Sequence, residues 1–322
     1  MSVKKTAFVT GASQGIGAAT ALALARDGYD VAVSSTQPGK LEGLLARLKA
    51  AGARAVPVAL DVRSQPSILE AMAAVTGAFG HLDVLVNNAG IPIRKPALEL
   101  APADWDAVMQ VNLAGAFFMS QQMGRHLVAS KRPGCIISIA STHGLVAARE
   151  RSVYGIAKAG VIHMTRMLAY EWAEHGIRVN AIAPGRVDTP SRAGSLAEPG
   201  YQQAALARVP LKRFATSEEV AAAACYLASP QAAAIAKREQ RMTSCVFGHR
   251  QQALGLDSAQ DQRDLLRLPD VIDLVGQIRP PKRDTEQELY PDHDPVAITN
   301  TDALLDQVQL EQPDIIGAGG LG

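Results

Sequence analysis

A glycine-rich turn between a strand and a helix restricts the fold of this chain more than any other feature. Residues 10–17 read Thr-Gly-Ala-Ser-Gln-Gly-Ile-Gly, directly after a short apolar run and directly before an amphipathic stretch. Glycines allow a tight turn and let backbone N–H groups approach a pyrophosphate, which the positive end of the helix dipole also favours. An ordinary strand-to-helix turn is the alternative, but the flanking strand and helix favour a dinucleotide-binding turn.

The rest of residues 1–230 alternates short apolar runs with longer amphipathic stretches. This alternation is typical of a parallel sheet covered by helices, so we predict an α/β, doubly wound parallel sheet (Rossmann fold). The predicted strands are 6–10, 30–35, 54–60, 82–87, 135–140 and 177–183, and the predicted helices are 15–26, 38–50, 67–79, 104–128, 154–174 and 217–228. Residues 186–210, rich in Pro, Gly and Ser, form the one long irregular connection and are a candidate lid.

Composition favours a small-molecule partner. The formal net charge is +1 and the charges of both signs are interspersed, so we expect no binding to nucleic acid or to a membrane surface. The three cysteines, Cys135, Cys225 and Cys245, are widely spaced and suggest neither a disulfide framework nor a zinc site. The first residues lack an apolar export signal and no run reaches membrane-spanning length, so we expect a cytoplasmic protein without a bound metal.

Further motifs follow the predicted strands in order. They are Asn87-Asn88-Ala89-Gly90 after the fourth strand, Asn112 in the next helix, Ser141 after the fifth strand, Tyr154 and Lys158 in the helix after that, and Pro184-Gly185 after the sixth strand. A serine thirteen residues before Tyr-x-x-x-Lys, downstream of the glycine turn and of Asn-Asn-Ala-Gly, is a highly specific combination. Together with the Gly-x-x-x-Gly-x-Gly spacing, it resembles the short-chain dehydrogenase/reductase family over residues 6–234, in particular 3-oxoacyl-(acyl-carrier-protein) reductases and gluconate-type dehydrogenases.

The Tyr154 and Lys158 pair makes chemical sense from its spacing alone. Residues i and i+4 of a helix project from one face, so the two side chains can share a site. A free phenol has a pKa near 10 and is a poor base at neutral pH, unless a nearby cation such as the Lys158 ammonium favours the phenolate. The alternative for an isolated pair is an interfacial tyrosine beside a solvated lysine.

The family resemblance implies a role for each member of the catalytic set. Tyr154 passes the proton, Ser141 hydrogen-bonds the substrate oxygen, Lys158 holds the nicotinamide ribose, and Asn112 positions a water that links Lys158 to solvent. Asp61 and Val62 would flank the adenine, and Val187 and Thr189 the carboxamide. The full set implied to contact the cofactor is Gly11, Ser13, Gln14, Gly15, Ile16, Gly17, Ser35, Thr36, Asp61, Val62, Asn88, Ala89, Gly90, Tyr154, Lys158, Pro184, Gly185, Val187 and Thr189.

The end of the second strand distinguishes NADP(H) from NAD(H). An acidic side chain there would accept hydrogen bonds from a 2′-hydroxyl and repel a 2′-phosphate, but this chain has Ser34-Ser35-Thr36. These hydroxyls and Ser13 can donate to a 2′-phosphate, whereas Asp30 lies at the other end of the strand and suits a turn. NADP(H) is therefore favoured, and NAD(H) stays possible because neither Gln14 nor Thr36 is an arginine.

Other candidate residues have simpler explanations. His143 can face the substrate, but a loop histidine without a proton task is the better interpretation. Arg94, Arg149 and Arg151 can bind an acidic substrate, although each alone is more often a solvated charge. Asp292-His293-Asp294 has metal-capable side chains without a third convergent motif, so we interpret it as a solvated loop.

The resemblance ends after Ala234, where the family has a last strand of the type Thr-Gly-x-x-apolar-x-apolar-Asp-Gly-Gly. We therefore expect a family domain at 1–234 and an atypical, partly disordered extension at 235–322. Three explanations stay open: a genuine extension, an insertion before a displaced strand at residues 315–320, or an altered reading frame or junction. The resemblance also implies a homodimer or homotetramer that depends on the last strand.

Two functions from different classes follow. The first is an oxidoreductase that transfers a hydride between NADP(H) or NAD(H) and a ketone or secondary alcohol, with 3-oxoacyl thioesters and sugar-acid ketones as the leading substrates. The second is a cofactor-binding or scaffolding protein that keeps the fold without turnover because of its altered C-terminus. The complete set of Asn112, Ser141, Tyr154 and Lys158 favours the first.

Overall fold

The computed structural model describes residues 4–190, 201–207, 209, 211–235 and 244–246. All of them belong to one compact unit, Met1–Gly276. The candidate strand at 315–320, the Asp292-His293-Asp294 motif and most of the predicted extension lie outside the described residues, so the division at residue 234 stays a prediction.

The described chain forms a seven-stranded parallel sheet in the order β3-β2-β1-β4-β5-β6-β7. The strands are β1 (Thr6–Val9), β2 (Asp30–Ser35), β3 (Ala55–Ala59), β4 (Val84–Asn87), β5 (Gly134–Ile139), β6 (Ile177–Ala183) and β7 (Ser244–Val246). The order reverses between β1 and β4, which is where doubly wound sheets bind ligands. The predicted Rossmann fold and its six strands are confirmed.

A seventh strand lies after residue 235, in the segment where the sequence predicted a displaced last strand only at residues 315–320. β7 pairs in parallel with β6, with Ala181 opposite Ser244 and Ala183 opposite Val246. A three-residue strand is too short for the alternation that predicts strands from sequence. The edge of the sheet beside β6 is therefore covered by residues that lack the family's sequence pattern.

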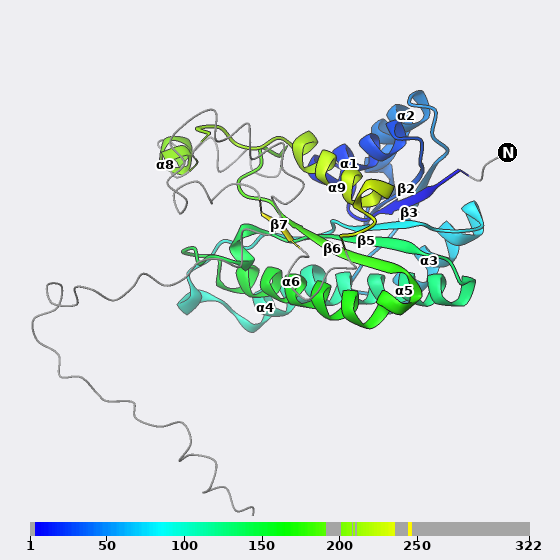
Figure 1. Ribbon diagram of the computed structural model, residues 1–322. Helices are drawn as coiled ribbons and strands as arrows, with labels where there is room; N and C mark the ends of the chain where they lie inside the picture. Colours follow the sequence, from blue (N-terminus) through cyan, green and yellow to red (C-terminus); the bar gives the residue numbers. More distant parts are fainter. Residues whose placement is uncertain (1–3, 191–200, 208, 210, 236–243, 247–322) are drawn as a thin grey trace, which may run out of the picture. The chain divides into compact units, whose positions relative to one another are not determined.

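Helices cover both faces of the sheet (Figure 1). One face carries α1 (Gly15–Arg26), α2 (Glu42–Ala50) and α9 (Ser217–Ala228), and the other carries α3 (Gln65–Phe79), α4 (Pro102–Met109), α5 (Gly115–Ser130) and α6 (Ser152–Trp172). Short 3-10 turns are η1 (Pro38–Leu41), η2 (Ala97–Glu99), η4 (Thr142–Gly144), η5 (Ala173–His175) and η7 (Pro230–Ala232). A further helix, α8 (Tyr201–Ala207), lies inside the segment predicted to be irregular, which corrects that expectation.

The helix predicted at 104–128 is divided by a π-helical turn, η3 (Gln110–Ala114). α4 ends at Met109 and α5 begins at Gly115, where a Cβ would lie 2.7 Å from Cβ of Val62. A π turn adds one residue to the helical turn and often occurs at a functional site. Here it carries Asn112, so the predicted catalytic asparagine lies at the one irregular place in this helical stretch.

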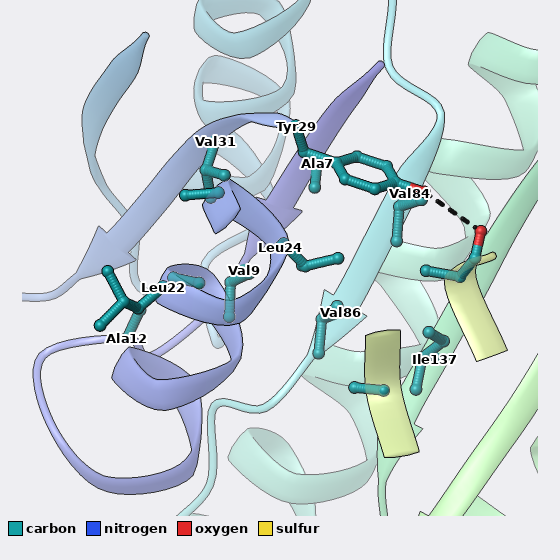
Figure 2. Close-up of a cluster of buried hydrophobic side chains, with 14 of the residues drawn as sticks. Ala7, Val9, Ala12, Leu22, Leu24, Tyr29, Val31, Val84, Val86 and Ile137 are labelled. Carbon is teal, nitrogen blue, oxygen red and sulfur yellow. Dashed lines mark hydrogen bonds between the residues drawn. The ribbon is translucent and has the colours of Figure 1, made fainter. Parts of the chain in front are cut away.

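Two apolar cores fill the space between the sheet and its helices. In the core under α1, α2 and α9, Leu24 and Val31 are fully buried beside the Tyr29 ring (Figure 2). The Tyr29 hydroxyl donates a hydrogen bond of 3.2 Å to the carbonyl of Ala228 at the end of α9. Because an unpaired buried hydroxyl costs stability, this bond ties α9 to the loop before β2.

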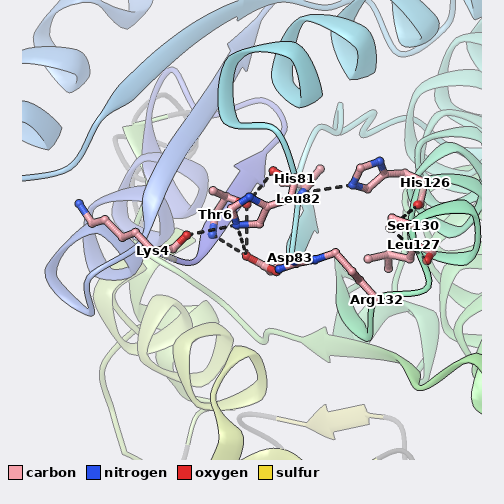
Figure 3. A network of polar contacts seen from close by, with 9 residues as sticks. All are labelled: Lys4, Thr6, His81, Leu82, Asp83, His126, Leu127, Ser130 and Arg132. Atoms are coloured by element: carbon pink, nitrogen blue, oxygen red, sulfur yellow. Dashed lines mark hydrogen bonds and ion pairs between the residues drawn. The ribbon is translucent and has the colours of Figure 1, made fainter. Parts of the chain in front are cut away.

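A polar network holds the amino end of β1 to that of β4 (Figure 3). The Asp83 carboxylate accepts a 2.9 Å bond from the Thr6 amide and pairs with Arg132 at 3.0 Å and His81 at 3.2 Å. His126 accepts from the Leu82 amide at 3.2 Å, and burial, the largest cause, lowers its pKa and favours the neutral ring that can accept. The network lies at the end of the sheet opposite the motifs of residues 10–17 and 87–90.

None of the helices in the described part of the chain is long and apolar enough to span a bilayer.

Replacing Gly17 by alanine is expected to destabilise the fold, because the new Cβ would lie 2.7 Å from the Gly11 carbonyl oxygen and 2.9 Å from Cα of Ala12. Overpacking of this kind costs about 1–3 kcal/mol. Gly77 is the control, since it is exposed within α3 and no described atom lies within 4 Å of its Cβ position. Alanine there should raise the unfolding free energy by about 0.4–1 kcal/mol. Urea unfolding measures both, and a Gly17→Ala protein as stable as the wild type would contradict the packing.

Candidate active site

Each predicted site segment follows the carboxyl end of a strand, and parallel strands bring those ends to one edge of the sheet. Residues 10–17 follow β1, residues 35–36 end β2, residues 61–62 follow β3, residues 88–90 follow β4, Ser141 follows β5 and residues 184–189 follow β6. The side chains of Asn112, Tyr154 and Lys158 come from η3 and α6.

Thr10 joins the glycine turn to the loop after β4. Its hydroxyl oxygen accepts bonds from the amides of Asn88 at 3.0 Å and Ala89 at 3.1 Å. The Asn88 side-chain amide in turn donates to the carbonyls of Thr10 at 3.0 Å and Gly11 at 2.9 Å. This role of Thr10 was not predicted, although two consecutive asparagines at a strand end already indicate side chains that need backbone partners.

The glycine turn disfavours a side chain at Gly11, through close packing and a positive φ, and at Gly15, through a positive φ. Gly11 has φ +63, and a Cβ on it would lie 2.8 Å from Cα of Ala89. Its amide donates to the Ser34 hydroxyl at 3.3 Å, so the end of β2 supports the turn. Gly15 has φ +59, and its Cβ position lies 3.5 Å from the methyl of Thr189, so the glycine turn lies beside the last predicted cofactor residue.

The start of α1 fits a pyrophosphate. The N-cap residue Gln14 is exposed and makes no side-chain cap bond, and the first turn of α1 holds no acidic residue. The first N–H groups of a helix have no partner within the helix, so these remain available to an anion. Ser13 lies half-buried on the same turn, while Ile16 packs against the core.

The ends of β2 and β3 place further predicted residues at this edge. The Ser35 hydroxyl accepts a 3.1 Å bond from the Gln37 amide, and Thr36 is exposed. Arg63 binds the Asp61 carboxylate, which lowers the pKa of Asp61 chiefly through that hydrogen bond and keeps it ionised. As predicted, Asp30 starts β2 at the other end, where it accepts from the Arg54 amide at 2.8 Å and pairs with Lys4 at 2.7 Å, but it belongs to the strand and not to a turn.

Asn112 binds the loop after β4 with both ends of its side chain. Its carbonyl oxygen accepts from the Ile91 amide at 2.7 Å, and its amide donates to the Ile91 carbonyl at 2.9 Å. A Cβ on Gly90 would lie 3.2 Å from Oδ1 of Asn112 and 3.7 Å from Nζ of Lys158. The structure therefore brings Gly90, Asn112 and Lys158 together, with Asn112 fixing the backbone that faces Lys158.

Lys158 is buried, with 5% of its surface exposed. Its Nζ donates a 2.6 Å bond to the Ile139 carbonyl at the end of β5 and lies 5.8 Å from the centre of the Tyr154 ring. Burial lowers the pKa of Lys158 to about 8, because a low-polarity environment disfavours the ammonium. The ammonium still predominates at neutral pH, where it can favour the phenolate of Tyr154.

Ser141 is buried and Tyr154 is half-buried. The hydroxyl oxygen of Ser141 accepts a 3.2 Å bond from the amide of His143, a residue to which no chemical task was assigned from sequence. The amide of Thr142, the residue after Ser141, donates a 3.0 Å bond to the Pro184 carbonyl. This bond joins the segments after β5 and β6.

The segment after β6 continues into a short bridge. Val187 is 4% exposed and pairs in parallel with Ala215, and the Asp188 amide donates to the Ala215 carbonyl at 2.8 Å. Gly185 is half-buried between Pro184 and this bridge.

Two of the three arginines considered for an acidic substrate have protein partners. Nε of Arg94 pairs with Glu150 at 2.5 Å, and a guanidinium nitrogen of Arg151 donates to the Ile93 carbonyl at 3.5 Å. Arg149 is exposed. Glu150 neutralises Arg94, so a substrate carboxylate would have to be bound by another residue.

Known proteins match most of the chain. The family model described as enoyl-(acyl carrier protein) reductase matches residues 11–239. The chain belongs to the short-chain dehydrogenase/reductase family. Cis-4-hydroxycyclohexanecarboxylate dehydrogenase of Sinomonas cyclohexanicum is 42% identical over 230 residues, 71% of this chain and 91% of that relative. The 3-oxoacyl-(acyl-carrier-protein) reductase of Thermotoga maritima is 37% identical over 227 residues, 70% of this chain and 91% of its own length.

Solved structures of the short-chain dehydrogenases/reductases share the fold. A variant of actinorhodin polyketide ketoreductase, solved with NADPH, superposes with a TM-score of 0.70 at 36% identity and covers 76% of this chain and 95% of its own. The relatives are named as dehydrogenases and reductases, so this chain is an oxidoreductase that acts on CH–OH groups and their carbonyl counterparts. The predicted family is confirmed.

Lys158 is expected to titrate near pH 8 in the protein without cofactor, because burial lowers the pKa to about 8. An exposed lysine titrates at about 10.4. Carbon NMR of protein labelled at lysine Cε measures the midpoint, and the resonance that disappears in Lys158→Met belongs to Lys158. A midpoint above about pH 10 would show that the amine is solvated.

Proposed function

We propose that this short-chain dehydrogenase/reductase transfers a hydride between NADP(H) and a ketone or secondary alcohol, with Tyr154 as the general acid and base. The observation that carries the proposal is the approach of buried Nζ of Lys158 to the Tyr154 ring, 5.8 Å from its centre. An ammonium buried beside a phenol lowers the free energy of forming the phenolate. The phenolate is the form that acts as a general base.

Each of the four catalytic residues has its own role in the proposed reaction. In ketone reduction, the Tyr154 hydroxyl donates its proton to the substrate oxygen and becomes a phenolate, and in alcohol oxidation the phenolate accepts the proton of the substrate hydroxyl. The Ser141 hydroxyl donates a hydrogen bond to the same oxygen. The bound nicotinamide supplies or accepts the hydride. Lys158 holds the nicotinamide ribose and favours the phenolate, while Asn112 positions a water next to Lys158 and keeps Gly90 and Ile91 in place through its two bonds to Ile91.

NADP(H) is the favoured cofactor and NAD(H) the alternative. The hydroxyl oxygens of Ser34 and Ser35 each accept a backbone N–H bond, which leaves each hydroxyl hydrogen free to donate to a 2′-phosphate. The acidic residue of this strand, Asp30, is occupied by Lys4 and Arg54 at the other end. The ketoreductase solved with NADPH supports the same choice.

The proposed substrates are 3-oxoacyl thioesters and sugar-acid ketones. The relative from Thermotoga maritima is named as a 3-oxoacyl-(acyl-carrier-protein) reductase, which supports the first class. A gluconate 5-dehydrogenase of Gluconobacter oxydans, 33% identical over 223 residues, supports the second. A scaffolding role without turnover is not favoured, because each of the four predicted catalytic residues lies at the same edge of the sheet.

A homodimer or homotetramer in the cytoplasm stays a prediction. It is supported by large apolar side chains that the described chain exposes on α5 and α6. Phe117 and Met167 are 36% and 48% exposed and line the same surface hollow. Exposed apolar side chains that cluster on one face are typical of an interface between subunits.

Tyr154→Phe is expected to lower kcat roughly 10²- to 10⁴-fold, because it removes the proton donor and leaves the ring in place. The assay follows NADPH and NADH absorbance with acetoacetyl-coenzyme A and 5-keto-gluconate. Tyr170→Phe, at a position 77% exposed on the same helix, is the matched control and should keep full activity. A Tyr154→Phe enzyme with wild-type kcat would overturn the proposed mechanism.

A further inference from the structure

The 3-10 turn η4 carries His143 from Ser141 to the side of Tyr154. The centres of the His143 and Tyr154 rings lie 6.3 Å apart, and their planes make an angle of 76°. This is the edge-to-face arrangement that aromatic pairs prefer. His143 is half-buried, so part of its ring packs against protein and not against water.

The backbone of His143 acts on the other catalytic side chain. Its amide donates a 3.2 Å bond to Oγ of Ser141. A hydroxyl has one hydrogen and two lone pairs, and this bond occupies one lone pair while leaving the hydrogen to donate. The Ser141 oxygen therefore accepts from the His143 amide, and its hydrogen can donate to the substrate oxygen.

Two glycines let η4 and α6 meet backbone to backbone. A Cβ on Gly144 would lie 2.7 Å from the carbonyl carbon of Lys158, and a Cβ on Gly155 would lie 2.8 Å from the carbonyl oxygen of His143. No side chain fits between the turn and the helix at these positions. The backbone of η4, from which the His143 ring projects, is therefore held against α6, the helix that carries Tyr154.

We propose that His143 is a positioning residue that sets the place of the Tyr154 phenol through its ring and the orientation of the Ser141 hydroxyl through its amide. The inference deepens the proposed function and rests on it for the roles of Ser141 and Tyr154. The ring contributes by packing and transfers no proton. A phenylalanine at this position preserves the edge-to-face contact without a titratable nitrogen, whereas an alanine removes the contact.

The test compares His143→Ala and His143→Phe with the wild type, and uses His163→Ala, an exposed histidine on α6, as the matched control. The first readout needs neither cofactor nor substrate: carbon NMR of protein labelled at tyrosine Cζ, with the Tyr154 resonance assigned by its loss in Tyr154→Phe. Cζ lies on the axis of ring flips, so extra or broadened signals report that the whole ring moves between positions. The second readout is kcat and KM for NADPH with acetoacetyl-coenzyme A.

We expect one sharp Tyr154 resonance in the wild type, His143→Phe and His163→Ala, and a broadened or divided one in His143→Ala. We also expect His143→Ala to lower kcat roughly three- to tenfold with little change in KM for NADPH, and His143→Phe to restore it. A sharp single resonance with full kcat in His143→Ala would overturn the proposal, and so would a His143→Phe protein as impaired as His143→Ala. If Tyr154→Phe keeps full activity, the proposed function fails, whereas the resonance still decides whether His143 positions the ring.

Discussion

The bonds between Thr10 and Asn88 hold together the edge of the sheet on which the site depends. Each residue follows a different strand, and each uses its side chain to satisfy backbone groups of the other segment. Gly11 packs against Ala89 in the space that these bonds define, where a Cβ would lie 2.8 Å from Cα of Ala89. These contacts hold the glycine turn in the position that presents the first N–H groups of α1. They also hold the backbone of the loop after β4 where it leads to Gly90 and Ile91.

The second half of the site extends from that loop. Asn112 fixes Ile91 from the π-helical turn, and Lys158 reaches the same place from α6 to bond the end of β5 at 2.6 Å. Its burial has a chemical consequence, because the ammonium that the mechanism needs predominates only below about pH 8. Burial thus brings the cation close to the phenol and also limits the pH range in which it is charged.

Much of this arrangement follows from sequence, and the exceptions have physical reasons. Strand ends in a parallel sheet share one edge, so placing Gly11, Asn88 and Ser141 after strands was enough to predict that they lie at the same edge. The i, i+4 spacing likewise predicted that Tyr154 and Lys158 share a face. Sequence patterns did not predict η3, because a π turn interrupts a helix without any glycine or proline signal. They also did not predict the contact of His143 with Tyr154, since a ring-to-ring approach depends on how η4 packs against α6.

Binding of NADPH to the full-length chain tests most directly whether this edge is a dinucleotide site. Isothermal titration calorimetry on the folded protein should show saturable binding of NADPH with one site per chain. A Gly17→Ala protein that is still folded should bind more weakly, because the added Cβ displaces the turn from which the first amides of α1 project. The absence of saturable binding of either NADPH or NADH to the folded wild-type chain would contradict the account.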